Sequence, residues 1–419
     1  MPSTSLYDIF KIIFGIVASV MILAFVLNYT DVFSSLQKGA QSAKTVENFK
    51  KAAEEVYLTG NPSEFGGFSR IWPEISFLAN EDPPAISYAS GRSAILTPVL
   101  FSPGSDILIT RATEDYGWWR FDSAIALPET VIVFNPVESS QENTDIIYGI
   151  AGIFSASYAY SPNVTFGVCS GSSIDAYMDY SGLDYRLKSA AALEKCEAEM
   201  PENFRLAAFS SDCTGFSGVC FAGNAAHIGE DTFAYSDALD MAFLIIGGDK
   251  EDVFGSTKGA NLFKYKKRVF AERISLASQI ASKRLGLIIP ELKSAMDSIN
   301  AGDFGDAACS AKYSRISGMI DSAISRLSSG NVNAAGSLME SIEAEYEEAK
   351  SGCIRLPSTV EIMLECSIFG FTKLRPAILH AADAAVYDHT DVTGAAALSQ
   401  ALEESRQKHT QYVQTGCVL

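Results

Sequence analysis

A long apolar run near the amino terminus constrains this chain more than any other feature. The sixteen residues from Ile12 to Leu27 (IIFGIVASVMILAFVL) carry no formal charge. Apolar side chains on both sides extend the run to about 20 residues, the length at which a helix crosses the hydrocarbon core of a bilayer. Lys11 can reach the lipid headgroups along its aliphatic stem. The sequence therefore predicts one membrane-spanning helix in contact with the lipid bilayer.

The alternative for this run is a cleaved secretory signal peptide. A cleavage site needs small residues, and the segment that follows, residues 28–33 (NYTDVF), has no such pattern. We therefore expect an uncleaved signal anchor and a single-pass protein. Its orientation stays open, because Lys11 on one side of the run is matched by Lys38 and Lys44 on the other.

The net charge excludes one class of partner. The 419 residues carry a formal net charge of −18. Binding to nucleic acid depends on a basic face that releases counterions from the phosphates, so we expect no nucleic-acid partner. The length suffices for an anchor and two domains of ordinary size.

Cysteine is the residue type that says most about the compartment. The chain has eight cysteines, none in a C-x-x-C pair, and only four histidines. This is poor material for a zinc site, and we expect no metal and no cofactor. The even number favours disulfides, although the sequence alone does not fix their connectivity. The pairs that suit the spacing are Cys213–Cys220, Cys309–Cys353 and Cys366–Cys417, which leaves Cys169 and Cys196 as a fourth pair.

Two N-x-[ST] sequons, at Asn28 and Asn163, are candidate glycosylation sites. Disulfide bonds persist in oxidising compartments outside the cytoplasm. Long domains also translocate largely regardless of the charges that flank an anchor. We therefore expect the bulk of the chain to be extracytoplasmic, with other envelope or surface proteins, and further copies of the chain, as its partners.

The segment after the anchor has the pattern of an amphipathic helix. From Asp31 to Leu58 apolar residues recur every three or four positions, and Gly60-Asn61-Pro62 ends the pattern. An apolar helix that continues into an amphipathic half resembles the amino-terminal architecture of type IV pilins and of the pilin-like surface proteins of archaea. The resemblance covers about the first 60 residues. It implies a membrane-anchored surface protein in a pilus-like assembly.

Three parts follow from the changes in composition along the chain. We expect an anchor and amphipathic helix over 1–60, a β-rich neck leading into an α/β sandwich over 61–260, and a helical bundle of antiparallel hairpins over 261–419. The predicted fold class is therefore α/β plus all-α. In the neck, Ala94–Phe101 and Asp106–Ala112 have the composition of strands.

Short, nearly continuous apolar runs predict strands that are covered on both faces. They occur at Thr130–Pro136, Val164–Ser170, Phe204–Ser210 and Met241–Gly248. The segments 144–160 and 173–200 between them are long enough for crossover helices. This alternation predicts a small, mainly parallel sheet.

Helical patterns dominate beyond Asn261. Two similar segments 28 residues apart contain Gly302-Asp303 and Gly330-Asn331, in which each glycine is suited to end one helix and the next residue to cap another. This indicates consecutive helical hairpins. The other expected helices cover Leu262–Leu285 and Leu287–Asn300, or start near Ser358 and near Val392, the last running to Gln414.

The sharpest catalytic pattern is G-x-C-x-G at residues 167–171, at the end of a predicted strand and before a predicted helix. It resembles the nucleophile elbow of class I glutamine amidotransferases and cysteine-dependent hydrolases, which implies Cys169 as the nucleophile and His227 as its base. Alternatively, Cys169 is buried or disulfide-bonded and His227 is a loop histidine. We favour the second interpretation, because an oxidising compartment tends to consume a free thiol.

Two further clusters each allow two interpretations. The aromatic residues of Tyr116–Phe121 can stack on a sugar or pack in a core, and core packing is the commoner use of large aromatics. The basic residues of Lys264–Arg268 can touch lipid headgroups or an acidic partner, and a solvated helix face is the simpler interpretation.

Taken together, these features predict a membrane-anchored structural or interaction protein of the cell envelope, and not an enzyme. The competing hypothesis is a membrane-tethered cysteine hydrolase or amidotransferase that uses Cys169 and His227.

Overall fold

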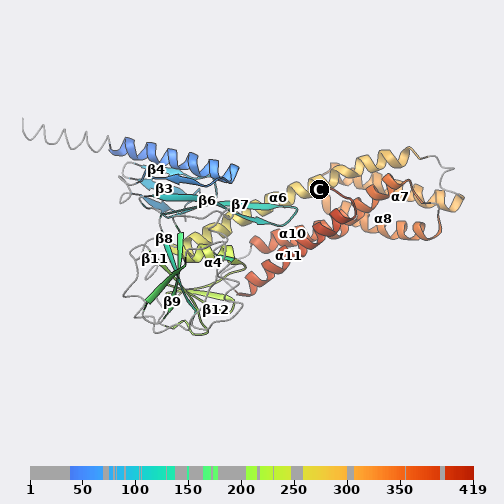
Figure 1. Cartoon of the computed structure of the whole chain (residues 1–419). Helices are drawn as coiled ribbons and strands as arrows, with labels where there is room; N and C mark the ends of the chain where they lie inside the picture. Colours follow the sequence, from blue (N-terminus) through green and yellow to red (C-terminus); the bar gives the residue numbers. More distant parts are fainter. Residues whose placement is uncertain are drawn as a thin grey trace, which may run out of the picture. The chain divides into compact units, whose positions relative to one another are not determined.

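The computed structural model describes residues 38–68, 75–78, 81, 83–88, 91–102, 104, 106–128, 130–136, 149–150, 164–170, 173–177, 204–214, 218–229, 231–246, 258–299, 306–353, 355–386 and 392–419 (Figure 1). The chain forms two compact units. Unit 1 contains the residues up to 111 and 124–129, and unit 2 contains 112–123 and 130–419. No helix in these described ranges is long and apolar enough to cross a membrane, and the predicted anchor Ile12–Leu27 lies outside them.

Unit 1 contains two small sheets. One is a three-stranded antiparallel sheet of β2 (Ser76–Leu78), β3 (Ala85–Tyr88) and β4 (Gly91–Ala94). The other has the order β1-β6-β7-β5 and is built from β1 (Ser63–Phe65), β5 (Val99–Phe101), β6 (Ile107–Asp115) and β7 (Arg120–Pro128). The expected strand Ala94–Phe101 is interrupted between β4 and β5, where Pro98 follows Thr97. Proline cannot donate to a strand ladder, which accounts for the interruption.

The helix over residues 38–59 supplies one side of the core of unit 1. Its apolar stripe, including Val46, Phe49 and Val56, is buried together with Phe68 and Phe101 of the same unit. The ring centroids of Phe49 and Phe101 are 4.7 Å apart. The predicted amphipathic pattern is therefore used to pack this helix onto strands, and Gly60, with a φ of 79°, follows its last turn.

Unit 2 begins with a seven-stranded mixed sheet of order β10-β9-β8-β11-β12-β13-β14. Its strands are β8 (Thr130–Pro136), β9 (Val164–Ser170), β10 (Ser173–Tyr177), β11 (Phe204–Phe209), β12 (Val219–Ala222), β13 (Ala225–Ile228) and β14 (Asp231–Ala234). The four neighbouring strands β9, β8, β11 and β12 run parallel to one another. β10, β13 and β14 pair antiparallel at the two edges. The predicted strands β8, β9 and β11 are confirmed, whereas the antiparallel edges were not predicted.

Two of the sequence predictions for this section are wrong. The run Met241–Gly248 belongs largely to a helix, α4 (Ala238–Ile245), and not to a strand. Every residue from Leu239 to Ile245 is buried, and an apolar run that is covered on all sides carries no periodicity that separates a strand from a helix. The segment that starts at Ser173 was expected to be a crossover helix, and its first residues form β10.

The carboxyl-terminal part of unit 2 is helical, as predicted. Its elements are α6 (Lys258–Asp297), α7 (Ala307–Ser328), α8 (Val332–Gly352), α9 (Ser358–Phe369), the π-helical turn η4 (Gly370–Leu374), α10 (Arg375–Val386) and α11 (Val392–Gln414). The predicted starts at Ser358 and Val392 and the end at Gln414 are confirmed. α6 runs through Gly286 and Pro290, where a break was expected, because Leu285, Ile289 and Leu292 continue one buried stripe across that point.

The turn between α7 and α8 follows the predicted capping chemistry. Gly330 has a φ of 78°, which only glycine adopts without strain, and the Asn331 side chain accepts a hydrogen bond from the Ala334 amide at 3.1 Å. The start of α7 is capped by Asp306, which accepts from the Cys309 amide at 2.8 Å. The expected pair Gly302-Asp303 lies outside the described residues.

Candidate functional site

Three of the four expected cysteine pairs are joined. The sulfur atoms are 2.02 Å apart in Cys213–Cys220, 2.09 Å in Cys309–Cys353 and 2.00 Å in Cys366–Cys417. Cys213–Cys220 closes a loop between β11 and β12. Cys196 and the sequons at Asn28 and Asn163 lie outside the described residues, so the fourth pair and the two glycosylation sites stay predictions.

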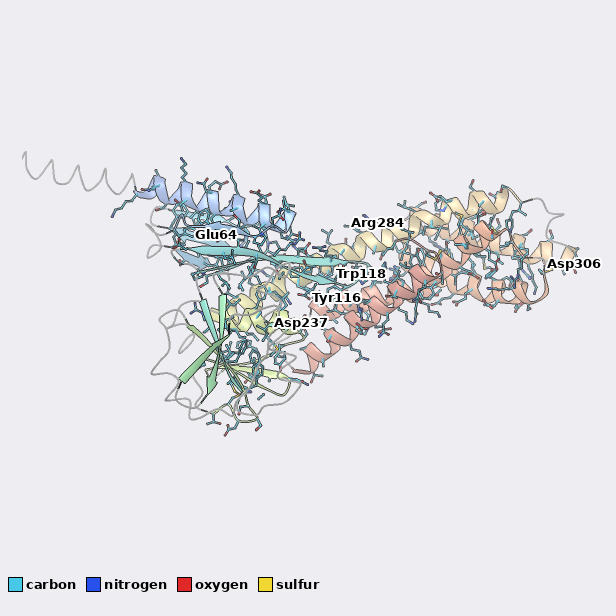
Figure 2. All side chains as sticks on the ribbon, in the orientation of Figure 1. Glu64, Tyr116, Trp118, Asp237, Arg284 and Asp306 are labelled. Atoms are coloured by element: carbon cyan, nitrogen blue, oxygen red, sulfur yellow. A yellow bond between two sulfur atoms is a disulfide. The ribbon has the colours of Figure 1, made fainter. Side chains whose placement is uncertain are left out.

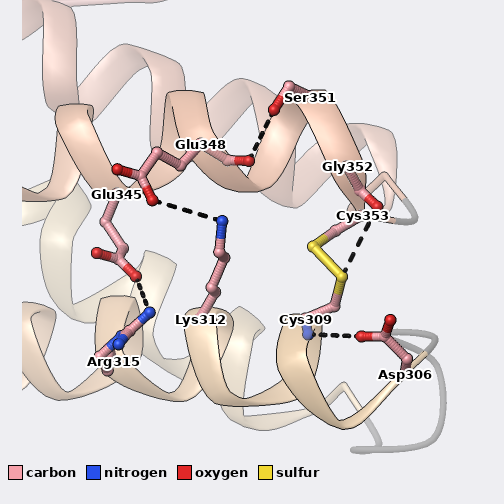
Figure 3. The surroundings of a disulfide bond; sticks show 9 residues. All are labelled: Asp306, Cys309, Lys312, Arg315, Glu345, Glu348, Ser351, Gly352 and Cys353. Atoms are coloured by element: carbon pink, nitrogen blue, oxygen red, sulfur yellow. Dashed lines mark hydrogen bonds and ion pairs between the residues drawn. A yellow bond between two sulfur atoms is a disulfide. The ribbon is translucent and has the colours of Figure 1, made fainter.

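Figure 3 shows how the Cys309–Cys353 bond ties the first turn of α7 to the end of α8. Ion pairs repeat the connection along the same two helices: Arg315 lies 2.5 Å from Glu345, and Lys312 lies 3.5 Å from Glu348. In each pair one partner, Arg315 or Glu348, is mostly exposed, so each pair adds little compared with the covalent bond. The hairpin is thus fixed at one end by its turn and at the other by a disulfide.

The structure does not bring Cys169 and His227 together. Cys169 lies in β9 and pairs across an antiparallel hairpin with Ile174 in β10, so the strand is not followed by the helix that a nucleophile elbow requires. His227 lies in β13, and not in a loop, with its Nδ1 atom 3.2 Å from the Thr232 hydroxyl. Three strands lie between β9 and β13, so four inter-strand spacings of about 4.8 Å place these two strands roughly 19 Å apart. Direct proton transfer needs hydrogen-bond contact, so His227 on β13 is not placed to act as a base for Cys169 on β9.

The aromatic cluster of Tyr116–Phe121 is a core element, as favoured from the sequence. It forms the tip of the β6–β7 hairpin. This tip, residues 112–123, belongs to unit 2. Trp119 lies edge-on to Phe270 of α6 at a centroid distance of 5.0 Å. The Trp118 indole nitrogen donates a hydrogen bond to the Ser405 hydroxyl of α11 at 3.0 Å. The rings therefore pack this tip onto two helices.

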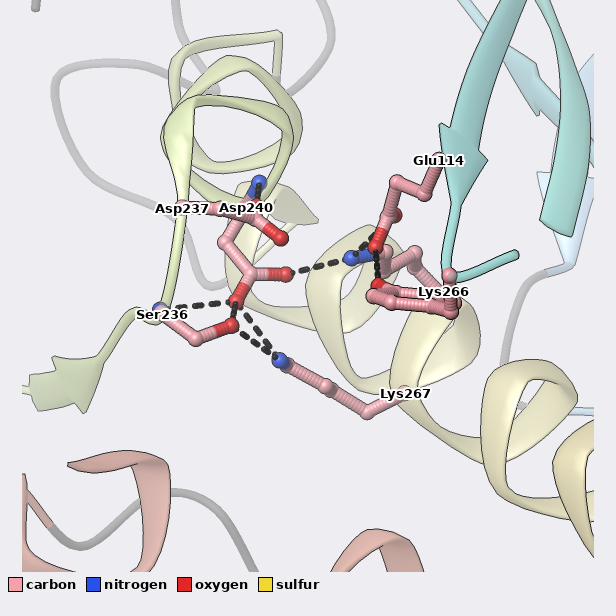
Figure 4. A network of polar contacts seen from close by, with 7 residues as sticks. Glu114, Ser236, Asp237, Asp240, Lys266 and Lys267 are labelled. Atoms are coloured by element: carbon pink, nitrogen blue, oxygen red, sulfur yellow. Dashed lines mark hydrogen bonds and ion pairs between the residues drawn. The ribbon is translucent and has the colours of Figure 1, made fainter. Parts of the chain in front are cut away.

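The basic cluster of Lys264–Arg268 is not the solvated helix face that was expected. Lys264 is exposed, but the Lys266 side chain is only 2% exposed and that of Lys267 only 11%. Lys266 reaches Asp240 of α4 and Glu114 of the hairpin tip, and Lys267 reaches Asp240 and Ser236. They form what we call the ion centre, defined as Glu114, Ser236, Asp237, Asp240, Lys266 and Lys267 (Figure 4).

Asp240 is the hub of the ion centre. Its side chain is fully buried, with Oδ1 2.7 Å from the Lys266 ammonium and Oδ2 2.6 Å from that of Lys267. Oδ2 also accepts hydrogen bonds from the Ser236 hydroxyl at 2.6 Å and the Ser236 amide at 2.9 Å. The Lys266 ammonium additionally lies 3.0 Å from Oε1 of Glu114. Two ammonium groups and two carboxylates thus balance each other away from water.

The neighbouring groups reinforce this arrangement. The Lys266 ammonium lies 5.4 Å from the ring centroid of Phe270, within range of a cation–π contact. The Tyr116 hydroxyl donates a hydrogen bond to the second oxygen of Glu114. Asp237 caps α4 by accepting from the Asp240 amide at 2.8 Å.

Burial and charge shift the protonation of the centre in definite directions. Burial alone would raise the pKa of Asp240, but Lys266 and Lys267 hold that pKa well below its usual range. Burial would lower the pKa of Lys266, whereas Asp240 and Glu114 raise it. Burial raises the pKa of Asp237 to about 7, opposed by Lys266 and supported by Asp240. Asp237 is therefore the group of the centre that titrates near neutral pH.

Unit 1 contains a cavity of about 320 Å³. It lies between the helix over residues 38–59 and the segment around Ile95 and Leu96. Lys50 in its wall is already engaged, with Glu47 at 3.5 Å and the Ser93 hydroxyl at 3.1 Å. The lining contains neither cysteine nor histidine, and it offers no nucleophile–base pair. Across the described residues there is also no group of three side chains suited to hold a metal ion.

Comparisons with protein-family models, curated proteins and solved structures give no match. The chemistry of this chain must therefore be inferred from its own residues.

Proposed function

We propose that this chain is a single-pass, membrane-anchored protein of the cell envelope, with its bulk outside the cytoplasmic membrane, and that it acts through protein contacts in a surface or pilus-like assembly. The observation that carries the proposal is the set of three disulfide bonds. Such bonds persist in oxidising compartments and are rare where thiols are kept reduced. The apolar run Ile12–Leu27 supplies the anchor.

The rigidity of the helical part supports a role in protein–protein binding. Long helices α6 to α11 share one buried core, and two disulfides fix its helix ends. A rigid body of this kind presents side chains in a constant arrangement, which lowers the entropy lost on binding.

An exposed apolar stripe on α6 is suited to such contacts. Leu276, Ile280 and Leu287 are 59%, 44% and 69% exposed. At 100° per residue their spacings place all three on one face of the helix. Arg284, labelled in Figure 2, lies on an exposed part of the same helix. Clusters of exposed large apolar side chains mark interaction surfaces.

Topology is tested in intact cells of a host that carries the full chain with a carboxyl-terminal tag. The cells receive a membrane-impermeant reductant and then an impermeant maleimide reagent, and labelling of the tagged protein is measured. The proposal predicts labelling in intact cells and retention in the membrane fraction after alkaline carbonate washing. A variant lacking residues 12–27 is the matched control and should leave the membrane fraction. Labelling only after lysis would overturn the proposed location.

Contact is tested separately with Leu287→Glu. The proposal predicts normal unfolding and localisation but loss of the higher-mass cross-linked species that the unmodified chain forms with its neighbours in the envelope. Ser341→Glu, which adds the same negative charge at an exposed position of α8 outside the stripe and removes no apolar surface, is the comparison. Identical cross-linking in the unmodified chain and Leu287→Glu would exclude this stripe as the contact surface.

A further inference from the structure

We propose that Lys266 and Asp240 are joined by an intramolecular isopeptide bond, formed by the chain itself with Glu114 as the group that transfers the proton. The inference depends only on the ion centre, and it holds wherever the protein is located.

Geometry places the two reacting groups in contact. The Lys266 nitrogen is 2.7 Å from Oδ1 of Asp240, and both side chains are almost completely buried. They come from different elements, α6 and α4, so the fold and not the local sequence holds them together. Groups held in contact react with effective concentrations of about 10⁵ M or more. An amine and a carboxylate that do not react in dilute solution can therefore react here.

The carboxylate of Asp240 is arranged asymmetrically. Oδ2 receives three donors, namely the Ser236 amide at 2.9 Å, the Ser236 hydroxyl at 2.6 Å and the Lys267 ammonium at 2.6 Å. When the Lys266 nitrogen adds to the carboxyl carbon, negative charge develops on an oxygen, and Oδ2 has the donors in place to stabilise it. Oδ1 is left as the oxygen that departs.

Glu114 completes the proton transfer. Its Oε1 atom lies 3.0 Å from the Lys266 nitrogen, within the range for a general base. Lysine begins as an ammonium with three protons and aspartate as a carboxylate. Two of the protons pass, through Glu114, to Oδ1, which leaves as water, and the third stays on the nitrogen of the new amide. The C–O bond breaks, the C–N bond forms, and no oxidant or other reactant is needed.

The surroundings favour the product over the ion pair. Holding an ammonium and a carboxylate away from water is costly, and replacing a buried ion pair by uncharged groups is often neutral or stabilising. The aromatic rings of Phe243 and Phe270 lie 5.9 Å and 5.4 Å from the Lys266 nitrogen. They limit the access of water to the site and so oppose hydrolysis. After bond formation Lys267 and Glu114 still balance each other in charge.

Peptide mass mapping of the purified full chain tests the bond directly. The protein is denatured, reduced, alkylated and digested with trypsin. Residues 206–250 contain no internal lysine or arginine, so they yield one peptide that carries Asp240. The proposal predicts this peptide linked to Tyr265-Lys266-Lys267, with no cleavage at Lys266 and a mass lower than the sum of the two peptides by one water. Fragmentation should place the link on Asp240.

Two variants assign the roles. Lys266→Arg keeps a positive charge but cannot form the amide, so its peptides should appear unlinked. Glu114→Gln leaves both reacting residues in place and should give at least tenfold less linked peptide. Both variants are first checked for cooperative unfolding and for an oxidised Cys213–Cys220 pair, so that a folding failure is recognised. Lys264→Arg, an exposed change two residues away, should link fully.

Each contrary result removes part of the inference. Unlinked peptides in the unmodified, folded protein would overturn the bond itself. A link to Lys267 would overturn the assignment to Lys266. Full linkage in Glu114→Gln would overturn the role of Glu114.

Discussion

Unit 2 is braced in two ways, and its two regions differ in what the braces are made of. The α7–α8 hairpin is closed by Cys309–Cys353, with partly exposed ion pairs beside it. The region around α4, the first turns of α6 and the hairpin tip is held instead by charges that are almost fully buried. A disulfide stabilises mainly by restricting the unfolded chain, whereas a buried ion centre depends on every partner being present. The two regions should therefore respond differently to mutation, reduction and pH.

The largest effect is expected from Lys266→Met. Removing one partner leaves Asp240 and Glu114 buried with one ammonium fewer, and such changes cost about 3–5 kcal/mol. The free energy of unfolding measured with urea should fall by this amount. Lys264→Met, which changes an exposed neighbour, should shift it by about 0.5 kcal/mol or less. Equal effects of the two variants would show that the ion centre is no brace.

The next effect is expected from Cys309→Ser combined with Cys353→Ser. The bond spans 44 residues, and removing a cross-link of this kind costs about 2–4 kcal/mol. Cys213→Ser with Cys220→Ser opens a span of only 7 residues and should cost less. Thermal unfolding of both double variants gives the comparison. A larger loss for the short loop would contradict the chain-entropy account of these bonds.

A pH effect sharpens the contrast, because Asp237 of the ion centre titrates near neutrality. The pKa of Asp237 is raised by burial to about 7 in the folded protein, against about 3.9 when unfolded. The folded state therefore binds the proton more tightly, and this group lowers stability as pH rises from about 4 to about 7, with no further change above.

Asp237→Asn tests this sign. Asparagine retains the acceptor that caps α4 but cannot ionise. The variant should gain about 1–2 kcal/mol over the unmodified chain at pH 7.5 and little at pH 4.5, allowing for partial exposure of the side chain. Urea unfolding at the two pH values measures the difference. A constant offset between the two proteins at both pH values would contradict the assignment to Asp237.

The smallest effect concerns the turn that closes the hairpin opposite its disulfide. Asn331→Ala removes the hydrogen bond to the Ala334 amide and should cost about 1 kcal/mol. Asn331→Asp keeps an acceptor and should be nearly neutral. If both variants lose the same amount, the cap is not the source of the stability of the turn.

The same comparison explains what could be predicted from the sequence. Cysteines are few and each disulfide joins two of them, so spacing and helix pattern sufficed to propose three pairs that the structure joins. Strands β8, β9 and β11 were predicted from their apolar runs. The same kind of run led to a wrong prediction for α4, because an apolar segment buried on every side has no hydrophobic periodicity that separates a helix from a strand.

The ion centre had no such signal. Lys266 and Lys267 were visible only as part of a basic run, and their partners Glu114 and Asp240 stand 152 and 26 residues from Lys266 in the sequence. Charges normally remain in water, so burial of these four could be learned only from the packing of the hairpin tip against α4 and α6. The separation of Cys169 from His227 depends on the order of the strands in the sheet. A local motif of five residues carries no information about that order.

The redox state of the cysteines in the cell tests the central claim most directly. Cells are quenched in acid, free thiols are blocked with one reagent, and disulfide sulfurs are labelled with a second after reduction. Mass mapping should find Cys213, Cys220, Cys309, Cys353, Cys366 and Cys417 carrying only the second label, as expected for a body folded outside the cytoplasmic membrane. The first label on all six, in protein taken directly from its native compartment, would contradict the account.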